Sequence, residues 1–123
     1  MKPFDIEISE ILKGPEELKL QLPIQAKVIQ QIQGKDRPDY FIVELDESII
    51  WIDKDKDINT EVNFIVIATK KKSQSVENSM KDVIIAIAYI KENSVLDDDE
   101  LDFNKISYVA DGKTSAKKKW GLF

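Results

Sequence analysis

Apolar and polar residues alternate with a period of two along several stretches of the chain. Phe4, Ile6 and Ile8 alternate with polar residues, and a longer stretch does the same over residues 18–28. Such alternation, rich in β-branched residues, is typical of strands that bury one face. Residues 62–68 and 83–90 are apolar at both parities, as expected for strands that are covered on both faces. The pattern therefore predicts a mainly β protein.

The same pattern predicts where strands bend and turn. The alternation changes phase between Val28 and Ile29, which indicates a bulge or a bend. The turn-rich residues 34–39 then precede a strand over residues 40–45, so that residues 18–45 are expected to form a long hairpin.

Later in the chain, residues 49–52 are a short apolar piece, and residues 101–110 predict a last strand with another phase shift. We expect Asp111 and Gly112 to end this strand.

Two segments allow a second interpretation. Residues 83–90 could be the buried part of a helix that begins near Ser75, but their Ile, Val and Tyr content favours a strand. Residues 14–17 fit either one helical turn, with Pro15 at its start, or a loop.

The length of 123 residues corresponds to one domain. We expect a single-domain antiparallel β-barrel, or a strongly curved sheet, of six to seven strands with at most one or two short helical turns. Residues 1–110 would form this domain and residues 111–123 a basic C-terminal tail. The tail contains Lys113 and the run Lys-Lys-Lys-Trp-Gly-Leu-Phe at 117–123, which fits a docking peptide or a weak contact with a membrane surface.

The amino-acid composition excludes several kinds of catalytic and metal site. The chain has no Cys and no His, which excludes disulfides, thiol nucleophiles and every mechanism that uses histidine as a base or ligand. We predict that the protein is not an enzyme and that it uses no cofactor and no metal.

Residues 1–10 carry three acids and no signal-peptide pattern, and no apolar stretch is long enough to cross a membrane. We expect a cytoplasmic protein, of bacterial type, without a membrane partner.

Two partial motifs fail on inspection. Residues 112–115 (Gly-Lys-Thr-Ser) resemble the end of a phosphate-binding loop, but Ser107 stands where the first glycine is required. Asp53, Asp55 and Asp57 have the spacing of a calcium loop, but Ile58 replaces its glycine and Phe64 its final glutamate. We interpret the first as a coincidence and the second as a solvated turn.

Charge argues against nucleic acid. The whole chain carries −5, and residues 1–110 carry 14 basic and 22 acidic groups, or −8; Arg37 is the sole arginine. Recognition of bases and phosphates relies on arginine and on continuous basic surfaces. A stacking platform of Tyr40, Phe41 and Trp51, as in an OB-like barrel that binds single-stranded nucleic acid or a small ligand, is the alternative. Core packing explains these aromatic residues better, since acids lie alongside them in the sequence.

The most distinctive feature is an acidic segment, residues 92–102, with six acids and no base. Its acids are Glu92, Asp97, Asp98, Asp99, Glu100 and Asp102. The segment fits a solvated loop, opened by a short helical turn capped by Ser94, and it also fits a contact patch for a basic surface. We therefore predict a protein-binding module of the inhibitor, immunity or adaptor kind, whose partner is another protein with a basic surface.

Overall fold

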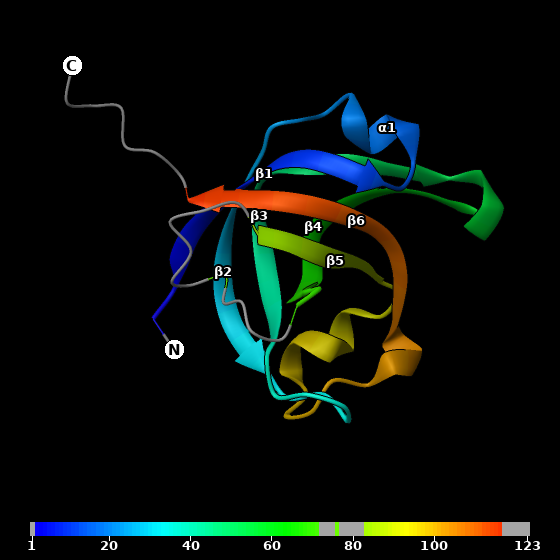
Figure 1. Ribbon diagram of the computed structural model, residues 1–123. Coiled ribbons are helices and arrows are strands. Elements are labelled where there is room, and N and C mark those ends of the chain that lie inside the picture. The colour runs from blue at the N-terminus through cyan, green and yellow to red at the C-terminus, as the bar shows by residue number, and fades with distance from the viewer. Residues whose placement is uncertain (1, 72–75, 77–82, 117–123) are drawn as a thin grey trace, which may run out of the picture.

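The computed structural model describes residues 2–71, 76 and 83–116. It is a closed barrel in which each strand pairs antiparallel with its sequence neighbours and β1 pairs with β6 (Figure 1). The described strands are β1 (Phe4–Lys13), β2 (Ile24–Ile32), β3 (Tyr40–Asp53), β4 (Ile58–Thr69), β5 (Val83–Ile90) and β6 (Ile106–Ala116). One short helix, α1 (Glu16–Lys19), and the 3₁₀ turns η1 (Lys54–Lys56), η2 (Asn93–Asp97) and η3 (Phe103–Lys105) complete it. The expected mainly β, barrel-like fold is confirmed.

Alternation of side chains fills the interior of the barrel. In every strand, successive side chains point to opposite faces, so the apolar residues of one parity gather inside. Each strand contributes buried residues to this core, among them Ile8, Val28, Val43, Ile67, Ile85 and Ala110. The strand prediction for residues 83–90 is confirmed, which removes the helical alternative for this segment.

A second, smaller core lies on the outside of the barrel. Ile42 of β3, Val66 of β4 and Ala88 of β5 point outwards and are nonetheless buried. The chain after β5 covers them, because Val95 and Leu101 pack on the same cluster and are 0% and 1% exposed. β4 and β5 are therefore apolar at both parities because one of their faces lies in the barrel core and the other is covered by the chain after β5, as the sequence indicated.

The prediction of a strand over residues 18–23 is wrong. Leu18 is buried but Leu20 is 85% exposed, so the alternation of leucines here does not mark the face of a strand. Instead α1 follows Pro15, with Glu16 in its first turn, and β2 begins only at Ile24. The helical interpretation of residues 14–17 is thus the better one, and the hairpin is formed by β2 and β3 alone.

Three other boundaries differ from expectation. Residues 49–52 belong to the long strand β3. The last strand begins at Ile106, since Leu101 lies between the isolated bridge at Glu100 and η3, which contains Phe103. That strand does not end at Asp111-Gly112 but continues to Ala116, because β1 and β5 pair with it on either side. The predicted bulge after Val28 is confirmed by a register shift between Val28 and Gln30.

A wide bulge in β3 shapes one end of the barrel. Glu44 pairs with Phe64 and Ile49 with Val62, so four residues of β3 stand opposite one residue of β4. Pairing of β3 with β2 also ends here, at Leu45. Beyond this point β3 and β4 continue as a two-stranded arm, which extends away from the barrel in Figure 1.

Candidate functional site

The acidic segment is fixed to the barrel by its apolar residues. Val95 in η2 and Leu101 pack into the outer core, and Leu101 N–H donates to the carbonyl of Gln33 at 2.8 Å. Glu100 forms a parallel bridge with Gln33, which lies just before the turn between β2 and β3. The predicted helical turn is present as η2, but Ser94 lies inside it, and Glu92, at the N-cap position, makes no capping hydrogen bond with its side chain.

Two of the six predicted site residues stabilise the segment itself. The Asp98 carboxylate accepts a hydrogen bond from Lys105 Nζ at 2.7 Å, and this contact raises the pKa of Lys105. The Asp102 carboxylate accepts from the backbone N–H of Asn104 and so caps η3. These two acids therefore anchor the end of the segment to η3.

The other four acids face solvent. Glu92, Asp97, Asp99 and Glu100 are exposed, and they project from a backbone that the outer core holds in place. An exposed set of like charges on a fixed scaffold produces a strong local potential, which favours an oppositely charged surface.

The structure adds an apolar groove that the sequence did not reveal. It has a volume of about 300 Å³ and lies on the outside of β4, β5 and β6, and one of its walls is formed by residues that follow the acidic segment in the chain. Its lining residues are Tyr40, Val66, Ile67, Ala68, Ala86, Ala88, Phe103, Ile106 and Tyr108. The alanines on β4 and β5 leave room between the larger side chains that line the groove. The groove begins where the chain after β5 stops covering the outside of the sheet.

Aromatic rings form the walls of the apolar groove. Tyr40 and Phe103 pack edge to face, with ring centroids 5.7 Å apart. The Tyr40 hydroxyl donates to Asp36, and burial together with this hydrogen bond raises the pKa of Tyr40 to about 12. Both tyrosines of the groove are thus neutral at physiological pH, since burial and a hydrogen bond to Asp111 raise the pKa of Tyr108 to about 12 as well.

Two cations stand over the rings of these tyrosines. Arg37 lies 5.9 Å from the Tyr40 centroid and Lys70 5.6 Å from that of Tyr108. Both cations have acidic partners: Arg37 bonds to Asp39, and Lys70 Nζ lies 3.4 Å from Asp111. The cations at the groove are therefore paired with acids within the protein, whereas Glu92, Asp97, Asp99 and Glu100 of the acidic segment are exposed.

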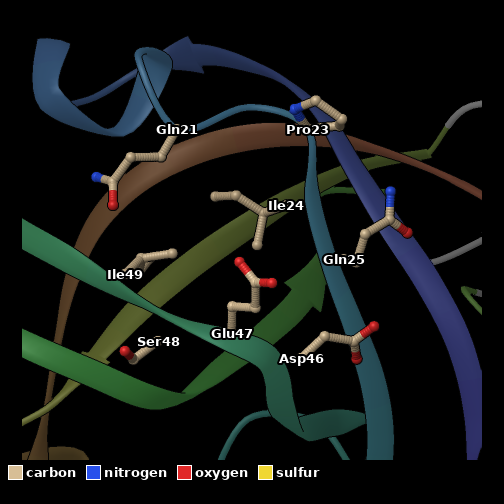
Figure 2. Close-up of a pocket in the computed structure, with 8 residues that line it drawn as sticks. All are labelled: Gln21, Pro23, Ile24, Gln25, Asp46, Glu47, Ser48 and Ile49. Atoms are coloured by element: carbon tan, nitrogen blue, oxygen red, sulfur yellow. The ribbon is translucent and has the colours of Figure 1, made fainter.

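A second pocket, of about 390 Å³, lies at the bulge of β3 (Figure 2). Gln21, Gln25, Asp46 and Glu47 give it a polar lining, and Gln21 enters from the segment before β2. Several of these groups already have partners. The Gln21 amide donates to the carbonyl of Ile50 and accepts from its N–H, at 2.7 and 2.8 Å, and Gln25 donates to Glu7. Gln21 therefore joins the segment before β2 to the arm, and Gln25 joins β2 to β1.

The remaining sequence motifs have structural positions. Gly112 and Thr114 lie within β6, paired with β1 and β5, so this stretch is extended strand and not a phosphate-binding loop. Asp53 ends β3, and residues 54–57 connect it to β4 through η1. The described residues contain no group of three or more acidic or other ligating side chains that could hold a metal. Phe41 and Trp51 are core residues, as expected, and Tyr40 belongs to the apolar groove.

Comparison with other proteins adds no relative. No protein-family model, curated protein or solved structure matches this chain. In the part of the chain that the structure describes, no helix is long and apolar enough to span a membrane.

Proposed function

We propose that the protein is a non-enzymatic binding module, of the inhibitor, immunity or adaptor kind, that recognises a protein partner with a basic surface. The observation that carries the proposal is that four exposed acids lie on a segment that the outer core holds in place, and that this segment leads into the wall of the apolar groove at Phe103. Protein interfaces combine an apolar centre with a polar rim, and charges at the rim accelerate encounter and set orientation.

The two parts of this face would have different roles in binding. Glu92, Asp97, Asp99 and Glu100 would attract the partner, because they are exposed and lie on the segment that precedes the groove wall at Phe103. The groove would supply the anchor, since large apolar side chains buried in pockets contribute most of the affinity at typical interfaces. The absence of His and Cys from the sequence is the reason for preferring binding to catalysis.

A small apolar ligand in the groove is the second candidate function. A volume of about 300 Å³ lies at the lower end of the range for ligand pockets, and the aromatic walls suit a flat ring. Single-stranded nucleic acid is less favoured. The strands follow one another around the barrel, unlike the Greek-key order of an OB fold, and the cations that stand over the groove tyrosines, Arg37 and Lys70, are paired with Asp39 and Asp111.

The test neutralises only the exposed acids. The triple variant Asp97→Asn, Asp99→Asn, Glu100→Gln leaves Asp98 and Asp102 intact, because their contacts with η3 hold the segment in place. The matched control removes the same charge from other exposed positions, on β1, in the bulge of β3 and just before β4: Asp5→Asn, Glu47→Gln and Asp57→Asn.

Partners captured with the wild-type protein from cells of its source are purified, and their association rates with each variant are measured at two salt concentrations. We expect the triple variant to associate about tenfold more slowly at low salt, with a flatter salt dependence, while the control keeps the wild-type rate. Equal rates for all three proteins would contradict the proposal. Binding by a small molecule that the triple variant retains in full would favour the second candidate.

A further inference from the structure

The apolar groove lies on the outer face of the sheet. Elsewhere on this face the chain after β5 covers the apolar side chains, but at the groove they are exposed. Phe103 and Tyr108 are 39% and 45% exposed, and Ile84, the outward residue of β5 before Ala86, is 36% exposed. Large apolar side chains gathered in one place on a surface usually mark a contact site. The chain that covers the outside of the sheet stops at Phe103, so no described residue covers the part of this face that surrounds the apolar groove.

The surroundings of the groove define the chemistry of what would cover it. Exposed acids precede it in the chain, and the cations at its rim are paired with Asp39 and Asp111. An occupant with complementary charge would carry several lysines or arginines next to a large apolar side chain.

The chain itself contains a segment with this chemistry. Residues 117–123 read Lys-Lys-Lys-Trp-Gly-Leu-Phe, so three cations are followed at once by Trp120 and then by two more large apolar residues. They lie outside the described residues. We propose that residues 117–123 of a second copy of this chain dock on this face, with an apolar side chain in the groove and the lysines against the acidic segment. The inference rests on the proposed function, because it names the basic partner of the same face.

The reach of the chain favours a second copy over the same copy. The acidic segment ends at Asp102, before η3 and the start of β6, whereas residues 117–123 follow the other end of β6, at Ala116. Ile106 and Ala116 are ten residues apart on β6, about 33 Å along a strand, and Lys119 can extend at most about 11 Å from Ala116. The lysines therefore cannot lie against the acidic segment of their own copy, whereas those of a second copy have no such limit.

The first experiment measures self-association of the full chain by sedimentation from about 10 µM to about 1 mM. We expect association that weakens at high salt and that falls at least tenfold on Trp120→Ala. Filling the groove with Ala86→Leu should have the same effect. The matched control, Asn59→Leu, adds the same side chain to an exposed position on the arm and should leave association unchanged.

The second experiment distinguishes the two copies. Because the chain has no Cys, Ile84→Cys and Gly121→Cys can be introduced into separate, distinguishable preparations and mixed under mild oxidation. We expect the mixed disulfide to exceed both homodimers and to disappear with Asn59→Cys in place of Ile84→Cys.

Each other outcome overturns the proposal. A protein that remains monomeric over the whole range, or one that associates equally well with Ala86→Leu, excludes docking of a second copy in the groove. A disulfide that forms only in the double variant Ile84→Cys, Gly121→Cys, independent of concentration, assigns the segment to its own copy. These results leave the proposed function to its own test, since a basic partner other than a second copy can still depend on Asp97, Asp99 and Glu100.

Discussion

The sole arginine has a structural role that its charge alone does not explain. The Arg37 side chain is 10% exposed, and its guanidinium bonds to both oxygens of Asp39, to the carbonyl of Thr69 and to the Thr69 hydroxyl. These contacts join the turn before β3 to the end of β4. The hydrogen bond with Asp39 raises the pKa of Arg37 further above its ordinary value, so the fork is always charged.

We predict that Arg37→Lys destabilises the protein although it keeps the charge. An ammonium group cannot reproduce the planar fork, so contacts with Thr69 are lost and the free energy of unfolding should fall by about 1–2 kcal/mol. Urea unfolding measures the change, with Lys35→Ala on the same turn as the control. Unchanged stability of Arg37→Lys would mean that the fork contributes nothing beyond its charge.

The tyrosines of the groove predict a loss of stability at alkaline pH. Burial, with hydrogen bonds to Asp36 and Asp111, raises the pKa of Tyr40 and Tyr108 to about 12, above the value near 10 for an unfolded chain. Because the folded protein favours the neutral phenols, these two tyrosines contribute their full stabilisation below about pH 10. This stabilisation is lost as the pH rises towards 12. Absorbance of phenolate at 295 nm should show late ionisation that Tyr40→Phe and Tyr108→Phe each reduce. Ionisation of both residues near pH 10 in the folded protein would be inconsistent with this view.

At the scale of elements, one side chain takes the place of a strand. Pairing of β3 with β2 ends at Leu45, and at Ile50 the Gln21 amide donates to the carbonyl and accepts from the N–H as a neighbouring strand would. Ile50 is 46% exposed, so this edge of the arm presents an apolar side chain next to backbone hydrogen-bonding groups. Unpaired apolar edges favour pairing with other chains.

We predict that Gln21→Ala lowers the free energy of unfolding by about 1–2 kcal/mol, because its two hydrogen bonds with Ile50 and its bond to the carbonyl of Glu17 are lost. It should also increase aggregation of partly unfolded protein, since the edge of β3 becomes available. Denaturant unfolding and light scattering measure the two effects. Gln31→Ala, which removes one 3.2 Å bond to the carbonyl of Pro38, is the matched control and should have the smaller effect on both.

At the scale of the whole molecule, local pattern predicted the barrel but not its outer surface. Alternation identified the strands and the bulge after Val28, because both depend on which residues face one core. It failed at Leu18 to Leu22, where the contact of Gln21 with Ile50, 29 residues away, fixes a different backbone path. The apolar groove depends on which outward residues the chain after β5 leaves uncovered, and no local pattern carries that information. The acids could be identified from the sequence, but the roles of Asp98 and Asp102 depend on their contacts with η3.

The order of the strands also bears on how the chain folds. Ile32 and Tyr40 close the β2–β3 hairpin eight residues apart, whereas Ile6 and Ala116, which close the barrel, are about 110 residues apart. The entropic cost of bringing the ends together grows with the logarithm of this separation, so closing the barrel costs about 2 kcal/mol more than closing the hairpin. Neighbouring strands can assemble as hairpins at little cost and then seal at the β1–β6 seam. We therefore expect the seam to form late in folding and to open first when the barrel is strained.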